Sequence, residues 1–162
     1  MMPRRTLVMM VKVPIAGRVK TRLTRSIGIG PATAFYRHAT FGLAMRLASP
    51  RRWSLVLAVA PDAQMRSPAL PFGTRRMRQG TGDLGQRLQH VFDDVPGGPV
   101  IVIGSDVPGI SQVDIAEAFR VLEGHEAVIG PSPDGGYWLI GLRRRPRRLK
   151  PFRNIRWSTH GA

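Results

Sequence analysis

The chain of 162 residues is 43% hydrophobic, contains no cysteine and carries a formal net charge of +15. This length suits one compact domain and leaves no comfortable room for a second, while the lack of cysteine excludes disulfides and thiolate metal sites. No apolar run reaches the roughly 18 residues that a membrane-spanning helix needs. We therefore expect a single soluble domain over residues 1–162, without a membrane partner and located in the cytoplasm.

The positive charge predicts attraction to polyanions, which include nucleic acid, anionic lipid and the phosphates of nucleotides. Much of this charge comes from arginine in a composition that is also rich in glycine, proline and alanine. A GC-rich genome explains such a composition equally well. Charge alone therefore assigns no function.

Strand and helix patterns alternate along the first half of the chain. The predicted elements are, in order, a strand at 6–13, a loop at 14–22, a helix at 31–47 with Pro31 in its first turn, a strand at 54–60 and a short strand at 75–78. The proline-rich segment that follows Pro61 indicates a surface connection.

The second half continues the alternation. Its predicted elements are a helix at 84–92 capped by Asp83, an apolar strand at 100–103, a helix at 111–122 that begins with a capping box of Ser111 and Asp114, and strands at 127–129 and 138–142. Strands that alternate with helices predict an α/β fold: a three-layer, mostly parallel, doubly wound sheet with helices on both faces.

The loop after the first strand carries three cations at alternate positions, Arg18, Lys20 and Arg22. In an extended stretch these side chains fall on one side and form a cationic clamp, which phosphoryl and nucleotidyl transfer need for the charge on phosphate oxygens. Gly17 lets the backbone approach an anion closely. The loop lacks the second glycine of a Walker P-loop. A solvated basic loop is the alternative that this motif leaves open.

Two aspartates follow predicted strands on the side where open α/β sheets bind their ligands. Asp106 comes after the most apolar strand, where a carboxylate would be costly unless it bound a cation or capped the helix at Ser111. Asp134 opens a glycine turn, which we interpret first as a hairpin. Magnesium takes one or two protein carboxylates and completes its coordination with water and substrate phosphates, so Asp106 and Asp134 would suffice.

A third candidate is the glycine-rich junction at 80–87, which leads from a strand into a helix. Such a junction presents backbone N–H groups and a helix N-terminus to a phosphate or a base. Its candidate residues are Gly82, Asp83 and Leu84, although Asp83 is first of all a helix cap. The four histidines show no metal-type spacing.

Five segments, taken together and in this order, carry a resemblance. They are Lys12-Val13-Pro14 to Leu23, Gly82-Asp83-Leu84-Gly85-Gln86-Arg87-Leu88, Ile103-Gly104-Ser105-Asp106-Val107-Pro108, Gly130-Pro131 to Leu142, and Trp157-Ser158-Thr159. In this combination the chain resembles the bacterial family of radical-SAM/selenodomain-associated transferases, which belongs to the glycosyltransferase-A-like superfamily of nucleotide-diphospho-sugar transferases. Family members continue beyond the Trp-Ser-Thr motif, so we expect this domain to lack C-terminal elements of the family.

The resemblance implies a glycosyltransferase-A-like fold and a metal-dependent chemistry. Guanylyltransferases of the same superfamily similarly place a basic loop after the first strand and a metal-binding aspartate after a central strand. The residues carried over are Arg18, Lys20 and Arg22 for the phosphates, Gly82, Asp83 and Leu84 for the base or ribose, and Asp106 and Asp134 for the metal; Gly17 joins the phosphate-binding candidates on its small size alone.

We therefore expect a transferase that acts on a nucleotide or a nucleotide sugar, with Mg²⁺ or Mn²⁺ as cofactor and with Lys20 and Asp106 as catalytic residues. Nucleotidyl transfer fits the cationic clamp better than glycosyl transfer, because cations are then needed around the phosphate under attack. One alternative is a nucleic-acid-binding basic module, suggested by the net charge and the basic run at 143–153. Another is a catalytically degenerate domain kept for protein contacts.

Overall fold

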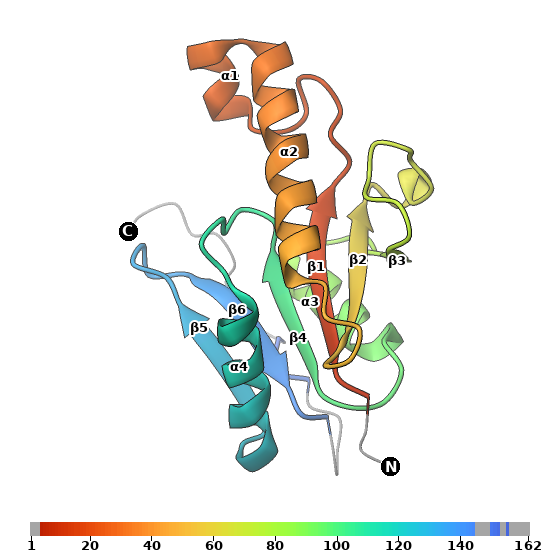
Figure 1. Ribbon diagram of the computed structural model, residues 1–162, viewed down its shortest axis with the longest axis vertical. Coiled ribbons are helices and arrows are strands. Elements are labelled where there is room, and N and C mark those ends of the chain that lie inside the picture. The colour runs from red at the N-terminus through yellow and green to blue at the C-terminus, as the bar shows by residue number, and fades with distance from the viewer. Residues whose placement is uncertain (1–3, 145–149, 153–154, 156–162) are drawn as a thin grey trace.

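The computed structural model of the protein describes residues 4–144, 150–152 and 155. Strands and helices alternate along the described chain (Figure 1). The strands are β1 (Thr6–Lys12), β2 (Ser54–Ala60), β3 (Arg75–Arg78), β4 (Val100–Gly104), β5 (Ala127–Pro131) and β6 (Tyr137–Leu142). The helices are α1 (Thr21–Ile27), α2 (Ile29–Leu47), α3 (Leu84–Asp94) and α4 (Gln112–Gly124), with a short 3₁₀ turn, η1 (Asp62–Gln64).

The strands form one six-stranded sheet in the order β3-β2-β1-β4-β6-β5. Strands β3, β2, β1 and β4 pair in parallel, and β6 runs antiparallel to both β4 and β5. The carboxyl ends of the parallel strands therefore meet at one edge of the sheet. Because β6 is reversed, the turn between β5 and β6 lies at that same edge.

Helices cover both faces of the sheet, with α2 and α4 on one side and α3 on the other (Figure 1). Alternate residues of the strands fill two separate cores, as expected for strands buried on both faces. Leu7, Met9 and Leu57 pack with residues of α2 and α4, whereas Val8 and Val102 pack with residues of α3. The prediction of a mostly parallel α/β sandwich with three layers is confirmed.

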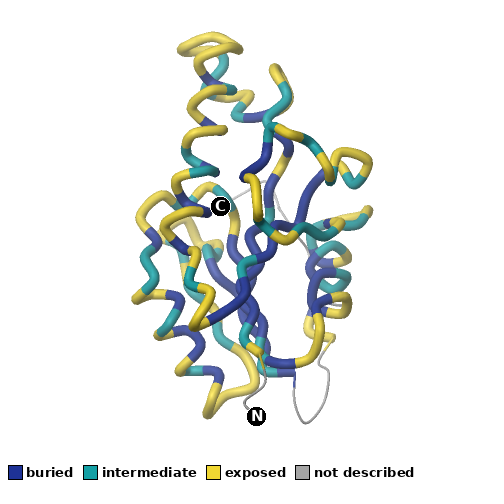
Figure 2. The backbone as a smooth tube through the Cα atoms, turned by 45° about the vertical axis from the view of Figure 1, so that its right-hand side comes forward, coloured by how far each residue is buried: buried dark blue, intermediate teal, exposed yellow. Residues whose placement is uncertain are grey.

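One helix differs from the prediction. Residues 14–22 were expected to form a loop, but α1 begins at Thr21 after Lys20, which adopts a left-handed conformation with φ of 50°. Helix α1 buries none of its residues, so its sequence lacks the apolar stripe by which helices are recognised. Together with the first turns of α2 it projects beyond the strand ends, as the exposed tip in Figure 2 shows.

Several arginines are bound to backbone carbonyls. The buried guanidinium of Arg144 donates hydrogen bonds of 2.5–2.9 Å to four backbone carbonyls at the end of α3. One belongs to Phe92, in the last turn of the helix, and the others belong to Val95, Pro96 and Gly98, which follow it. Arg76 similarly donates to carbonyls of the segment at 65–71. Arg144, which belongs to the basic run at 143–153, is therefore buried and engaged with the backbone, while residues 145–149 of that run lie outside the described part of the chain.

Within the described ranges, none of the helices is both long enough and apolar enough to cross a membrane. The expected cytoplasmic location stays a prediction.

Candidate active site

An open pocket of about 1560 Å³ lies at the edge where the parallel strands end. It is formed by the ends of β1 and β4, the loop from β1 to α1, residues of α1, α2 and α3, and the hairpin between β5 and β6. Its polar lining residues are Lys12, Arg18, Lys20, Thr21, Arg22, Ser26, Tyr36, Gln79, Ser105, Asp106, Asp134 and Tyr137. Segments that are far apart in the sequence thus contribute to one site.

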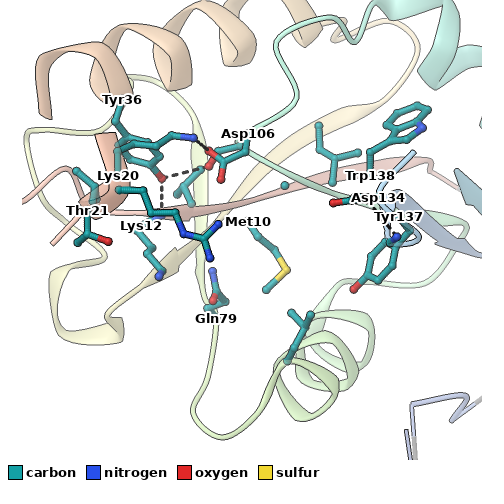
Figure 3. Close-up of a pocket in the computed structure, with 18 of the residues that line it drawn as sticks. Met10, Lys12, Lys20, Thr21, Tyr36, Gln79, Asp106, Asp134, Tyr137 and Trp138 are labelled. Atoms are coloured by element: carbon teal, nitrogen blue, oxygen red, sulfur yellow. Dashed lines mark hydrogen bonds and ion pairs between the residues drawn. The ribbon is translucent and has the colours of Figure 1, made fainter. Parts of the chain in front are cut away.

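Lys20 and Asp106 meet in this pocket. The ammonium nitrogen Nζ of Lys20 lies 2.8 Å from Oδ1 of Asp106, and this ion pair connects the end of the β1 loop with the segment after β4 (Figure 3). Both side chains reach solvent, with exposed fractions of 29% for Lys20 and 65% for Asp106. The pair is therefore accessible to a ligand.

The Asp106 side chain is exposed, which contradicts the expectation that its carboxylate is costly to place after β4. A carboxylate in that position was expected to be costly unless it bound a cation or capped a helix, but an exposed side chain pays little desolvation. It is not the helix cap either, since Ser111 caps α4 in a capping box with Asp114. Lys20 is the partner that Asp106 has in this structure.

A buried tyrosine fixes the floor of the pocket. The hydroxyl of Tyr36, on α2, accepts a hydrogen bond from the backbone N–H of Lys12 at 2.9 Å and lies 3.1 Å from Oγ of Ser105. Tyr36 is only 5% exposed. One phenol thus holds the end of β1 and the residue before Asp106 at fixed positions.

A second buried polar side chain, Gln79, stands at the end of β3. Its amide nitrogen donates to the carbonyl of Ala58 at 3.1 Å, and its amide oxygen accepts from Nη1 of Arg87 at 3.3 Å. These two contacts orient the amide at the wall of the pocket. Gln79 and Tyr36 were not selected from the sequence, because a lone Gln and a lone Tyr carry no spacing signal.

Asp134 lies in the hairpin between β5 and β6, as its glycine turn predicts. Gly135 N–H donates to the Ser132 carbonyl at 3.0 Å, and Gly136 N–H donates to Oδ1 of Asp134 at 3.1 Å. Hydrogen bonds from the Ser132 side chain and from Gly136 N–H lower the pKa of the Asp134 carboxyl below its ordinary value. The charged form is thereby favoured, and Figure 3 places Asp134 across the pocket from Lys20.

The three cations of the basic loop face the pocket as predicted, but the backbone that carries them is not extended. Arg18, Lys20 and Arg22 all line the pocket. An extended stretch does not present them, because Lys20 has left-handed backbone angles and Arg22 belongs to the first turn of α1. Gly17 has a φ of 74° and stands outside the lining residues, so it turns the loop without facing the pocket.

The glycine-rich junction contributes one of its three candidates to the pocket, Leu84. Asp83 caps α3, as predicted, and the structure adds that it forms a capping box with Gln86; it stands outside the residues that line this pocket. Gly82 has a φ of 93°, and a Cβ atom there would collide with the Gln86 side chain. The structure therefore explains Gly82 and Asp83 by the start of α3, and their contact with a base or ribose stays a prediction.

The residues at the pocket fit a divalent cation of the magnesium type. The described residues contain no group of three or more histidine, cysteine or acidic side chains that could hold a metal ion. Two carboxylates, Asp106 and Asp134, do line the same pocket, and Ser105, the residue after β4, also lines it. Hard oxygen ligands in this number suit Mg²⁺, which keeps several waters and binds substrate phosphates.

Comparison with known proteins places the chain in a family. Residues 43–159 match the model of the family described as "Uncharacterized protein conserved in bacteria (DUF2064)". The chain belongs to this family. No match to this DUF2064 member was found among the curated proteins.

Solved structures extend the comparison. A crystal structure from Desulfovibrio desulfuricans G20, described as that of a candidate nucleotide-diphospho-sugar transferase, is 31% identical, with a TM-score of 0.83 over 95% of this chain and 69% of the other. A 4-diphosphocytidyl-2C-methyl-D-erythritol synthase from Anaerococcus prevotii DSM 20548 is 10% identical, with a TM-score of 0.56 over 87% and 71% of the two chains. CMP:2-keto-3-deoxy-manno-octonic acid synthetase complexed with CTP is 12% identical, with a TM-score of 0.50 over 87% and 74%.

These comparisons confirm that this DUF2064 member has the fold of nucleotide-diphospho-sugar transferases. The predicted association with radical-SAM proteins stays a prediction. The Trp157-Ser158-Thr159 motif, which contributed to the resemblance, lies outside the described residues.

Proposed function

We propose that the protein is a metal-dependent transferase that acts on a nucleotide or a nucleotide sugar. The observation that carries this proposal is the convergence of Lys20 and Asp106, which lie 2.8 Å apart at the carboxyl edge of the sheet. In open α/β sheets this edge is where ligands bind. The pocket around the pair combines cations for phosphates with carboxylates for a metal.

The comparisons support the nucleotide. The structure from D. desulfuricans is described as a candidate nucleotide-diphospho-sugar transferase, and the octonic acid synthetase is complexed with CTP. A nucleotide is also what the pocket suits by its charge, because Lys12, Arg18, Lys20 and Arg22 line it together. Fixed cations stabilise the charge on phosphate oxygens without reorganisation of solvent.

Several polar groups of the pocket have a role in this proposal. Lys20, Arg18 and Arg22 would bind the phosphates, and Asp106 would hold a divalent cation, with Asp134 as its second ligand. Such a cation, when bound, would act as a Lewis acid that stabilises negative charge on the phosphoryl oxygens. Tyr36 keeps the Asp106 segment in place through Ser105, and Gln79 presents an amide to the nucleotide.

Between the two reactions, the pocket favours nucleotidyl transfer. An acceptor oxygen then attacks the α-phosphate, pyrophosphate leaves, and cations are needed around the phosphorus under attack. The clustering of Arg18, Lys20 and Arg22 in the loop after β1 and in the first turn of α1 supports this choice. Both synthases among the solved structures have cytidine nucleotides in their names, which supports the same choice.

Calorimetric titration with nucleoside triphosphates and nucleotide sugars, each with and without MgCl₂ or MnCl₂, tests the proposal. We expect a triphosphate to bind only in the presence of the cation, and we expect Asp106→Asn to abolish this binding. Asp93→Asn is the matched control, because Asp93 is an exposed aspartate on α3, away from the pocket, and its loss should change nothing. Failure of every nucleotide to bind, combined with nucleic-acid affinity of steep salt dependence, would transfer support to the basic-module alternative.

A further inference from the structure

We propose that Lys20 is an internal counter-ion for Asp106 that must leave before the site works, so that divalent cation and nucleotide bind cooperatively. In the free protein the ammonium group of Lys20 is paired with the Asp106 carboxylate, which is also the proposed ligand of the divalent metal ion. When the cation takes Asp106, Lys20 is released toward the phosphates. This inference rests on the proposed function, and it adds an order and a coupling to it.

The ion pair between Lys20 and Asp106 is weak enough to be broken when a ligand binds. Its two side chains are 29% and 65% exposed, so that water and salt reduce their attraction. An exposed pair of this kind is worth about two- to fivefold in an equilibrium constant. This is too little to exclude a divalent cation and enough to reduce its affinity measurably.

The exchange requires movement of one side chain only. The backbone carbonyl of Lys20 accepts hydrogen bonds from the N–H of Thr24 at 3.0 Å and from its hydroxyl at 3.2 Å. These bonds belong to the first turn of α1 and do not involve the ammonium group. Lys20 therefore stays fixed at its backbone while its flexible stem moves the charge from one partner to another.

Arg18 and Arg22 do not compete with a metal ion for Asp106 as Lys20 does. Between described residues of the pocket, the contact of Lys20 with Asp106 is the one ion pair. Arg18 and Arg22 line the pocket without such a bond to a described carboxylate. Lys20 is therefore the cation whose availability depends on the state of Asp106. Asp134, the other carboxylate of the pocket, is engaged with its own hairpin.

Such competition makes the two ligands depend on one another. A cation on Asp106 removes the partner of Lys20, which then adds its charge to the phosphate site. By linkage, the factor by which the cation strengthens nucleotide binding equals the factor by which the nucleotide strengthens cation binding.

The first test needs no metal. Inorganic pyrophosphate is titrated by calorimetry, with a chelator present, into the wild type and the single variants Asp106→Asn and Asp134→Asn. The titration is repeated with two double variants, in which Lys20→Met is added to each of these single variants. Both Asn variants remove one negative charge from the pocket, but only Asp106→Asn frees Lys20. We expect Asp106→Asn to bind pyrophosphate about two- to fivefold more tightly than Asp134→Asn, and the difference to vanish when Lys20 is Met.

The second test uses the metal alone. Mn²⁺ binding without nucleotide is followed by the loss of the signal of free Mn²⁺ in electron paramagnetic resonance. We expect Lys20→Met to bind Mn²⁺ about two- to fivefold more tightly than Arg25→Met. Arg25 is the matched control, since it lies in α1, the helix that Lys20 precedes, is exposed and stands outside the pocket.

The outcomes separate this inference from the proposed function. If nucleotide binds with Mg²⁺ while either test shows no difference between the paired variants, the internal competition is refuted and the transferase proposal stands. If neither pyrophosphate nor Mn²⁺ nor any nucleotide binds, both proposals fail. Circular dichroism of each variant verifies that the fold is retained.

Discussion

The phenol oxygen of Tyr36 lies 3.1 Å from the hydroxyl oxygen of Ser105, although 69 positions of the sequence separate the two residues. The same oxygen accepts the backbone N–H of Lys12 at 2.9 Å. A single buried side chain of α2 therefore connects the ends of β1 and β4, which are adjacent in the sheet. The pocket takes its shape from this connection.

We expect Tyr36→Phe to lower the free energy of unfolding by about 1–3 kcal/mol, because the Lys12 N–H loses its acceptor while the ring still fills its space. Urea denaturation measures the change. We also expect weaker metal-dependent nucleotide binding, since Ser105 and Asp106 lose an anchor. Ordinary surface substitutions change the free energy of unfolding by up to about 0.5 kcal/mol. A loss below this value would show that the hydrogen bonds of the Tyr36 hydroxyl do not stabilise the fold.

The arginine that closes α3 should matter for stability. We expect Arg144→Met to cost about 2–4 kcal/mol, because four backbone carbonyls lose a charged donor at once. Arg144→Lys should recover only part of the loss, since an ammonium group lacks the planar fork of the guanidinium. Thermal and urea unfolding check both variants. Arg51→Met, in an exposed turn, is the charge-matched control and should lie within about 0.5 kcal/mol of the wild type.

Two glycines should respond to alanine with opposite signs. A Cβ atom at Gly141 would lie 2.7 Å from Val128 Cγ1 and 3.1 Å from Ile101 Cγ1, so Gly141→Ala overpacks the core and should cost about 1–3 kcal/mol. Gly42 lies in the middle of α2 with nothing within 4 Å of such an atom. Gly42→Ala should therefore stabilise by about 0.5–1 kcal/mol through helix propensity. Urea denaturation of both variants, run in parallel, decides whether the signs differ.

The capping box of α4 should make stability depend on acid pH. The Ser111 hydroxyl, followed by its backbone N–H, lowers the pKa of the Asp114 carboxyl. A carboxyl with a lowered pKa in the folded state contributes stability above its ordinary pKa, and this contribution is lost as the pH falls through the folded value. We expect Ser111→Ala to reduce the Tm near neutral pH and to lose less Tm than the wild type on acidification to about pH 3. Equal losses in the two proteins would argue against this cap.

Much of the fold follows from the sequence, because its signals are local. The apolar strand at Val100–Gly104, the helix cap at Asp83, the capping box at Ser111 and the glycine turn after Asp134 are each recognisable in a few residues. Burial on both faces makes the strand wholly apolar, and cap geometry requires a fixed spacing of side chains. These elements form where the patterns predict them.

The pocket is less predictable, since its contacts join distant segments. Tyr36 and Gln79 are important through partners that only the folded chain brings near, Ser105 and Ala58 among them. Helix α1 was missed for a different reason. It buries no residue, and it begins after a lysine in a left-handed conformation that sequence alone does not reveal. Lys20 and Asp106 were found because chain order places both after strands that turn out to be neighbours in the sheet.

The reversed direction of β6 has a consequence for how this scaffold diversifies. The turn that carries Asp134 lines the same pocket as the ends of β1 and β4, and it connects β5 and β6 as a hairpin between two neighbouring strands at the edge of the sheet. Residues can be inserted or exchanged in that turn without disturbing either core. Under the proposed function, recognition of different acceptors can therefore change at the hairpin while the loop that carries Lys20 and the segment after β4 that carries Asp106 remain unchanged.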